Sequence, residues 1–172
     1  MSRELWLLRH GKSDRDSDLA DIDRPLKKRG KRAAHTLGAW MRRQELIPDR
    51  VLTSPAERAT ATAIRVCEEL GVGIDAVYQD KRLYASNIEL IQGVLAECPE
   101  GVQRLLLVGH NPELEQFLTD LVGVADLPLK KKLMPTTTLA RMAMPDDWTR
   151  LEPGCAKLLS ITDVKSLFDE TD

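Results

Sequence analysis

The chain has 172 residues, a formal net charge of −2 and 42% hydrophobic residues. This near-neutral charge excludes an extended nucleic-acid or anionic-membrane surface, and no apolar run is long enough to span a bilayer. Three widely spaced cysteines, Cys67, Cys98 and Cys155, form no metal-ligand pattern and are typical of reduced thiols. We therefore expect a cytoplasmic protein of one domain, residues 1–172, with no nucleic-acid or membrane partner.

Short apolar runs alternate with longer segments of helical periodicity. The apolar runs predict strands at residues 5–8, 51–53, 76–78, 105–108, 138–144 and 156–161. The periodic segments predict helices at residues 28–44, 55–70, 87–97 and 112–122, and Gly71 ends the second helix. The alternation favours an α/β fold, a three-layer α/β/α sandwich around a mainly parallel sheet, with the last two strands as candidate edge strands.

Two of the predicted strands lead directly to a histidine. The stretch "LLRHG" places Arg9 and His10 after the first strand, and "LLVGHN" places His110 after the fourth. Because ligands bind at the carboxyl edge of a parallel sheet, we expect these side chains to lie close together at that edge. Gly11 permits a sharp turn there and a close approach of a ligand to the backbone.

The stretch "LTSPAERATATA", residues 52–63, has the pattern of a helix start. Ser54 is the predicted N-cap, Pro55 takes the first helical position, and Glu57 completes a capping box with Ser54. Glu57 thereby receives a structural role. Arg58 is different, because a cation in the first turn faces the positive end of the helix dipole and is unfavourable unless an anion compensates it.

Together, Arg9, His10, Arg58 and His110 predict a binding site for a phosphoryl group. Arginine forks match phosphate oxygens, and a histidine can attack phosphorus if its other ring nitrogen donates to a backbone carbonyl. Water then hydrolyses the phosphohistidine. The sequence shows no cluster of carboxylates around the histidines, so we expect neither a metal nor another cofactor.

Three motifs, "LLRHGKS", "SPAERATATA" and "VGHN", occur in this order between about residues 5 and 120 and resemble the histidine phosphatase superfamily, also called phosphoglycerate-mutase-like. The stretch "DRPLKKRGKRAA" and the short chain are most similar to the SixA-type phosphohistidine phosphatases of bacteria. The resemblance implies one domain of the histidine phosphatase fold. It further implies that His10 is the phosphorylated nucleophile, that Arg9 and Arg58 bind phosphoryl oxygens, that His110 stabilises the transition state, and that Arg24 contacts phosphate or substrate.

The general acid of the larger family has no counterpart at its usual position. Mutases and many phosphoesterases of the superfamily carry a glutamate in a stretch like Arg-Leu-X-Glu, whereas "DKRLYAS" puts Ala85 there. An alkoxide leaving group needs such an acid, but a protonated phosphoramidate expels neutral imidazole with much less help. The missing acid favours phosphohistidine as the substrate. Glu89 is the alternative acid, although its pattern is that of a solvated helix residue.

Three functions remain as hypotheses. The leading one is a metal-independent phosphatase that dephosphorylates phosphohistidine in a signalling protein of a phosphorelay. The second is hydrolysis of a small phosphoester or phosphoanhydride, and the third is a phosphate-recognition module without turnover, which would not need His10. The basic segment 24–32 is either a solvated surface or a surface that steers an acidic phosphoprotein. We expect the loops at residues 12–25 and 123–137 to select the substrate.

Overall fold

The computed structural model describes residues 3–16 and 18–170, which form one six-stranded sheet with the strand order β3-β2-β4-β1-β5-β6. The first four strands in the chain are parallel to one another: β1 (Arg3–Arg9), β2 (Arg50–Thr53), β3 (Val77–Gln79) and β4 (Arg104–Gly109). The last two, β5 (Thr138–Met144) and β6 (Lys157–Asp163), pair in antiparallel fashion. The mainly parallel sheet is confirmed, but of the two strands expected at an edge only β6 lies there, because β5 lies between β1 and β6.

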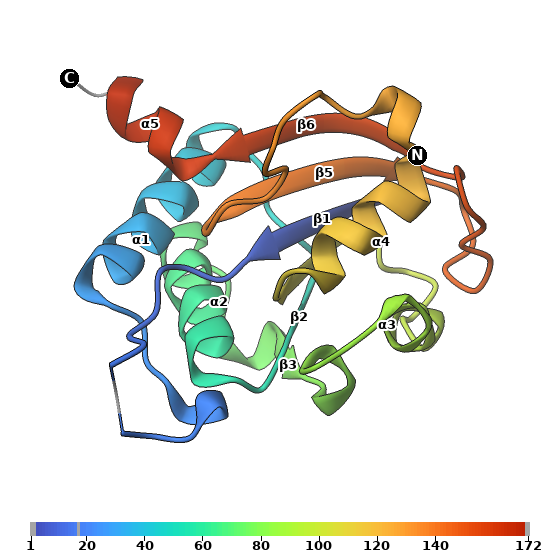
Figure 1. Ribbon diagram of the computed structural model, residues 1–172. Helices are drawn as coiled ribbons and strands as arrows, with labels where there is room; N and C mark the ends of the chain where they lie inside the picture. The colour runs from blue at the N-terminus through green and yellow to red at the C-terminus, as the bar shows by residue number, and fades with distance from the viewer. Residues whose placement is uncertain (1–2, 17, 171–172) are drawn as a thin grey trace.

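Helices cover both faces of this sheet (Figure 1). One face packs against α1 (Lys28–Arg43), α2 (Glu57–Leu70) and α5 (Val164–Glu170), and the other against α3 (Ile88–Ala96) and α4 (Glu113–Val122). The predicted three-layer sandwich is therefore confirmed, and α5 is a helix that the sequence pattern did not indicate. None of the helices in the described part of the chain is long and apolar enough to cross a membrane.

The central strand β1 contributes to both hydrophobic cores. Leu5 and Leu7 pack with α3 and α4, whereas Trp6 and Leu8 pack with α1 and α2, and all four side chains are fully buried. Burial on both faces explains why this strand is a continuous apolar run instead of an alternating one.

The pairing of β1 with β4 determines where the two histidines lie. Arg9 is in register with Gly109, so His10 and His110, the next residues in the chain, leave the sheet side by side. The backbone amide of His10 donates to the carbonyl of Gly109 at 3.1 Å. Thr53 at the end of β2 is in register with Val108, which brings the start of α2 to the same carboxyl edge.

The predicted capping box at Ser54 and Glu57 is wrong. Helix α2 begins at Glu57, two residues later than expected, and its N-cap is Ala56, which makes no side-chain capping bond. The Ser54 hydroxyl instead accepts from the amide of Ala56 at 3.2 Å and contacts the ring of His110 at 2.7 Å. Because that hydroxyl is already engaged at the sheet edge, it does not reach the first turn of α2, and Glu57 is exposed.

Candidate active site

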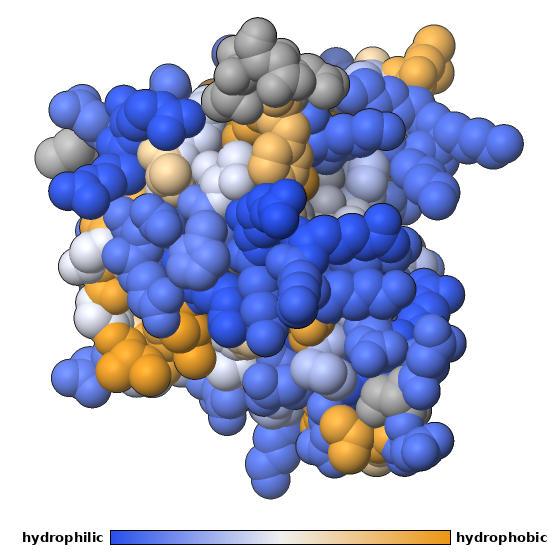
Figure 2. All heavy atoms as spheres, turned by 90° about the vertical axis from the view of Figure 1, so that its left-hand side faces the viewer, coloured by the Kyte–Doolittle hydropathy of each residue, from blue (hydrophilic) through white to orange (hydrophobic). Residues whose placement is uncertain are grey.

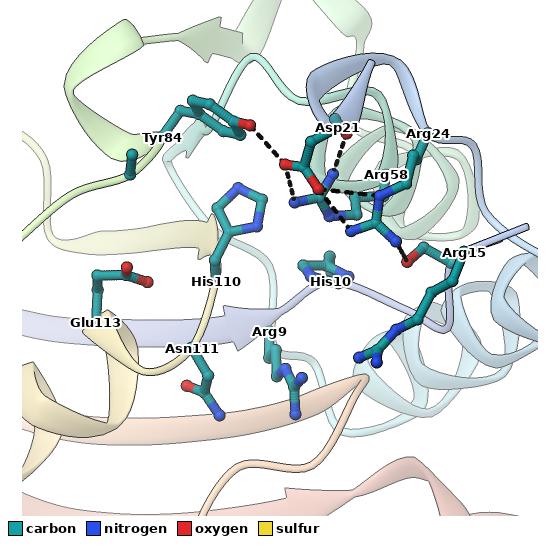
Figure 3. A pocket seen from close by; sticks show the side chains of 12 residues that line it. Arg9, His10, Arg15, Asp21, Arg24, Arg58, Tyr84, His110, Asn111 and Glu113 are labelled. Atoms are coloured by element: carbon teal, nitrogen blue, oxygen red, sulfur yellow. Dashed lines mark hydrogen bonds and ion pairs between the residues drawn. The ribbon is translucent and has the colours of Figure 1, made fainter. Parts of the chain in front are cut away.

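A cavity of about 270 Å³ opens at the carboxyl edge of the parallel strands (Figure 3). Its lining includes all five site residues expected from the sequence: Arg9, His10, Arg24, Arg58 and His110. It also includes Ala85, the residue at the position of the family's acid. Glu89, the alternative acid, is exposed on α3 and is not among the described residues that line this cavity.

The His10 ring has the orientation that a nucleophile requires. Its Nδ1 lies 2.7 Å from the carbonyl oxygen of Gly11, and because a carbonyl can only accept, Nδ1 carries the proton and donates it. Nε2 is therefore unprotonated in the neutral ring. Burial lowers the pKa of His10 to about 3, with the nearby cations Arg58 and Arg9 acting in the same direction and the bond to Gly11 opposing. The side chain is neutral at physiological pH.

Backbone contacts hold the segment that carries His10. The amide of Gly11 donates to the hydroxyl of Thr62 on α2 at 3.0 Å, and this hydroxyl donates to the carbonyl of Arg58 at 2.7 Å. A Cβ atom on Gly11 would lie 3.0 Å from the carbonyl oxygen of Gly30 in α1. The backbone of α1 thus approaches Gly11 closely, and the approach of a ligand to this glycine stays a prediction.

His110 is held by the end of β2. Its Nε2 lies 2.7 Å from the Ser54 hydroxyl, and its Nδ1 is buried without a partner among the described residues. Burial first, and Arg58 second, lower the pKa of His110 to about 4, while Asp21 opposes the shift. A neutral ring with one unengaged nitrogen has spare hydrogen-bonding capacity for a ligand in the cavity.

Arg9 enters the cavity from the end of β1. One guanidinium nitrogen donates to the carbonyl of Met134 at 3.2 Å, and Nε is buried with no partner among the described residues. Asn111 donates to the same carbonyl at 2.9 Å. Burial lowers the pKa of Arg9, and Glu115 partly offsets that effect. The guanidinium remains charged, because an arginine cannot be deprotonated in this pH range.

The anion expected beside Arg58 is a carboxylate of the chain itself. Arg58 is only 6% exposed, and its two terminal nitrogens donate to the carbonyl oxygen of Asp21 at 2.6 Å and to the carboxylate of Asp21 at 3.1 Å. Arg24 donates to the other carboxylate oxygen of Asp21 at 3.0 Å. Asp21 therefore links the two arginines across the mouth of the cavity, as the dashed lines in Figure 3 show.

Tyr84 completes this group. Its hydroxyl donates to the carboxylate of Asp21 at 2.5 Å, and its ring meets the His110 ring edge-on at a centroid distance of 5.7 Å. The hydrogen bond from Tyr84, followed by the bond from Arg58, lowers the pKa of Asp21 to about 2, although desolvation opposes the shift. Sequence reasoning missed both residues, because each lies in an irregular segment whose position no periodicity indicates.

Ala85 lies in the cavity lining, and one further carboxylate that was not expected lies there too. Ala85 has a φ of 50°, a left-handed conformation, and its methyl group supplies no proton. Glu113, in the first turn of α4, lines the same cavity and was not singled out from the sequence. Among the described residues, no group of three or more histidine, cysteine, aspartate or glutamate side chains could hold a metal ion. Independence from metal ions stays a prediction.

Comparisons with known proteins agree on one family. Residues 5–103 match the model of the histidine phosphatase superfamily (branch 1). An uncharacterised protein of Mycobacterium tuberculosis is 32% identical over 157 residues, which cover 88% of this chain and 96% of that protein. The phosphohistidine phosphatase SixA of Escherichia coli is 27% identical over 119 residues, or 69% of this chain and 73% of that protein. The solved structure of a protein histidine phosphatase SixA complexed with tungstate is similar, with a TM-score of 0.78 and 22% identity over 95% of this chain and 99% of that chain.

Proposed function

The chain belongs to branch 1 of the histidine phosphatase superfamily, and from this membership we propose that it removes the phosphoryl group from phosphohistidine in a protein of a cytoplasmic phosphorelay. The observation that carries the proposal is the orientation of the His10 ring. Its proton is held on Nδ1 by the Gly11 carbonyl, so Nε2 has a free lone pair in a cavity that four arginines line. A module that only bound phosphate would not need a nucleophile in this state.

In the first proposed step, Nε2 of His10 attacks phosphorus. The bond between phosphorus and the substrate nitrogen breaks, and the substrate imidazole leaves as a neutral group that carries the proton it held in the phosphoramidate. In the second step, a water molecule attacks the phosphohistidine of the enzyme. Inorganic phosphate leaves, and the electron pair of the broken bond returns to His10 Nε2.

Arg9, Arg58 and His110 have proposed roles in both steps. Charge that spreads over the equatorial phosphoryl oxygens needs positioned donors, and arginine forks supply them in pairs. Arg9 and Arg58 would bind these oxygens, and the unengaged Nδ1 of His110 would donate to one of them in the transition state. Arg24 is the proposed further contact, since it shares Asp21 with Arg58.

Alanine at the position of the family's general acid supports a phosphoramidate substrate over an alkyl phosphoester. Ala85 lines the cavity and cannot protonate a departing alkoxide. General acid catalysis is typically worth about 10²–10⁴-fold, so its absence penalises esters of alcohols most. The 27% identity with the phosphohistidine phosphatase SixA of Escherichia coli points to the same substrate class.

Glu113 favours the second candidate, a phosphatase for small phosphoesters. Its carboxyl group lies in the lining of the same cavity and, if protonated, could assist a leaving alcohol. Glu89 is not among the described residues in the cavity lining, so Glu113 replaces it as the residue to test in this role.

A direct comparison of substrates separates the two candidates. We expect kcat/KM for a phosphorylated histidine-containing phosphotransfer domain to exceed that for a phosphoserine peptide by about a hundredfold or more. His10→Ala should remove the turnover of both. Efficient hydrolysis of the phosphoserine peptide without any release of phosphate from the phosphotransfer domain would contradict the proposal and support the small-phosphoester function.

A further inference from the structure

A second hollow adjoins the active-site cavity. It has a volume of about 270 Å³ and shares four lining residues with the first cavity, Arg9, His10, Ser13 and Arg15. Besides Arg9, its charged lining consists of Lys12, Arg15 and Lys132, and we name it the basic lobe. Lys12 and Arg15 follow β1, whereas Lys132 comes from the segment before β5, so the lobe joins two loops that are far apart in the chain.

The three cations of the basic lobe form no ion pair with any residue that the structure describes. All three side chains, Lys12, Arg15 and Lys132, are exposed. No carboxylate is among the described residues that line the lobe. The carboxylate of Glu115, which acts on Arg9, already accepts from the amide of Met134 at 2.8 Å.

The start of α1 adds positive potential next to the lobe. Lys27 is the N-cap, Lys28 begins the helix, and the first turn contains no acidic residue, so the cations there add to the positive end of the helix dipole. The amide of Lys27 donates to the carbonyl of Lys12 at 2.9 Å, which ties the helix start to the lobe. A Cβ atom on Gly30 would lie 2.3 Å from that carbonyl, so glycine is required for this contact.

Mutual repulsion of these cations is visible at Lys12. Its pKa lies below the usual lysine value, first because of the charge of Arg29, then because of desolvation, and then because of Arg15 and Lys27. The repulsion among these charges is relieved when an anion binds between them. Figure 2 views the molecule from the side toward which β1 points and shows a mostly hydrophilic face.

We propose that the basic lobe binds a second anionic group of the substrate, a carboxylate or a phosphate, next to the phosphoryl group that His10 attacks. For a protein substrate, which rests on the function proposed above, this group is an acidic side chain beside the phosphohistidine. The lobe would then select phosphohistidines in an acidic surface, because exposed charges act mainly on encounter and specificity.

Two phosphohistidine peptides of equal length test this inference, one with glutamates and one with glutamines on both sides of the phosphohistidine. In the wild-type protein at low salt, we expect kcat/KM to be about tenfold higher for the glutamate peptide. The double variant K12Q/K132Q should lower that ratio to about twofold. The matched control is K130Q/K131Q, which removes two exposed charges from the same loop outside the lobe and should keep the ratio. The ratio should also fall toward one as salt screens the charges.

A second set of measurements uses small inhibitors of aryl phosphate hydrolysis, fructose 1,6-bisphosphate and fructose 6-phosphate. If the lobe takes the second phosphate, the bisphosphate inhibits more tightly than the monophosphate, and K12Q/K132Q reduces that advantage about fivefold. A larger effect of K12Q/K132Q on the peptide ratio identifies a carboxylate of a protein substrate as the second anion. A larger effect on the inhibitor ratio identifies a second phosphate of a small substrate.

Either change in ratio supports the basic lobe as a second anion site. Equal ratios in the wild-type protein and K12Q/K132Q, with both peptides and both inhibitors, would overturn the inference. If the wild-type protein hydrolyses neither peptide, the proposed phosphohistidine function fails, but the inhibitor measurements still decide whether the lobe binds a second anion.

Discussion

The rings of His10 and His110 lie 5.0 Å apart between centroids, at an interplanar angle of 59°. The two residues follow different strands, and the parallel register that aligns Arg9 with Gly109 sets this distance. At this separation, a phosphoryl group carried on His10 Nε2 can be contacted by the second ring. Folding of the sheet alone therefore assembles the two histidines of the proposed mechanism.

In the proposed mechanism, Asp21 competes with the substrate for Arg58 and Arg24. Its carboxylate occupies donors that the mechanism assigns to phosphoryl oxygens, and it places a negative charge at the mouth of an anion site. We expect Asp21→Asn to lower the inhibition constant of inorganic phosphate about threefold, because one like-charge repulsion is removed. Tyr84→Phe is the matched control, since it deletes the third partner of Asp21 but keeps the charge. Weaker phosphate binding in Asp21→Asn would mean that Asp21 mainly orients the arginines.

The absent acid predicts a strong dependence on the leaving group. With Ala85 in the cavity, kcat/KM should fall steeply as the leaving-group pKa rises, from activated aryl phosphates to alkyl phosphates, because each 1.36 kcal/mol of missing stabilisation costs about tenfold in rate. The measurement is a series of aryl and alkyl phosphates in the wild-type protein, Glu113→Gln and the exposed control Glu89→Gln. A shallow dependence that becomes steep only in Glu113→Gln would show that Glu113 supplies the acid.

The two buried histidines predict a loss of stability in mild acid. In the unfolded chain they bind protons near pH 6.5, whereas the folded pKa values are lowered to about 3 for His10 and about 4 for His110. Between these limits the unfolded state binds more protons, so the free energy of unfolding decreases as the pH falls from 6.5 toward 4. We expect each histidine to lower the free energy of unfolding by roughly 1–2 kcal/mol at pH 5 relative to pH 7. Urea unfolding at pH 7 and at pH 5 measures this difference in the free energy of unfolding.

His110→Gln is the matched variant for this pH effect. It removes one of the two titrating groups, so the decrease in unfolding free energy between pH 7 and pH 5 should shrink to about half. An unchanged decrease in this variant would show that His110 already binds its proton in the folded state at pH 5.

Treatment with EDTA should leave the activity unchanged. Charge neutralisation in the proposed mechanism comes from Arg9 and Arg58, and no step uses a metal ion. The measurement is aryl phosphate hydrolysis before and after chelation, followed by addition of Mg²⁺. Activity that is lost with EDTA and restored by Mg²⁺ would contradict the proposed charge stabilisation.

The layers of the fold could be predicted because they depend on local patterns. The buried run of β1 and the helical periodicity of α1 each follow from burial on fixed faces, so their positions agreed to within a few residues. The start of α2 was predicted two residues early, because the Ser54 hydroxyl contacts His110 across the sheet edge and the amide of Ala56, not an amide in the first turn of α2. Such a contact between distant segments leaves no mark in the local sequence.

The candidate site was predictable where its residues follow strands. Arg9, His10 and His110 are placed by the register of β1 and β4, which the apolar runs indicate. Asp21 and Tyr84 were not found, because each enters the cavity from a loop whose path depends on tertiary contacts. Arg58 was predicted only in part. Its unfavourable position in the first turn of the helix indicated a nearby anion, but not that Asp21 supplies it.

Trapping the phosphorylated enzyme tests the central claim most directly. The protein is mixed with an excess of activated aryl phosphate, quenched in alkali within the first turnover and digested, and the phosphorylated residue is identified by mass spectrometry. We predict a phosphohistidine at His10, a burst of aryl alcohol of about one per active site if the second step is the slower one, and no phosphorylation in His10→Ala. A phosphoryl group on any other residue, or full turnover by a correctly folded His10→Ala variant, would contradict a covalent mechanism through His10.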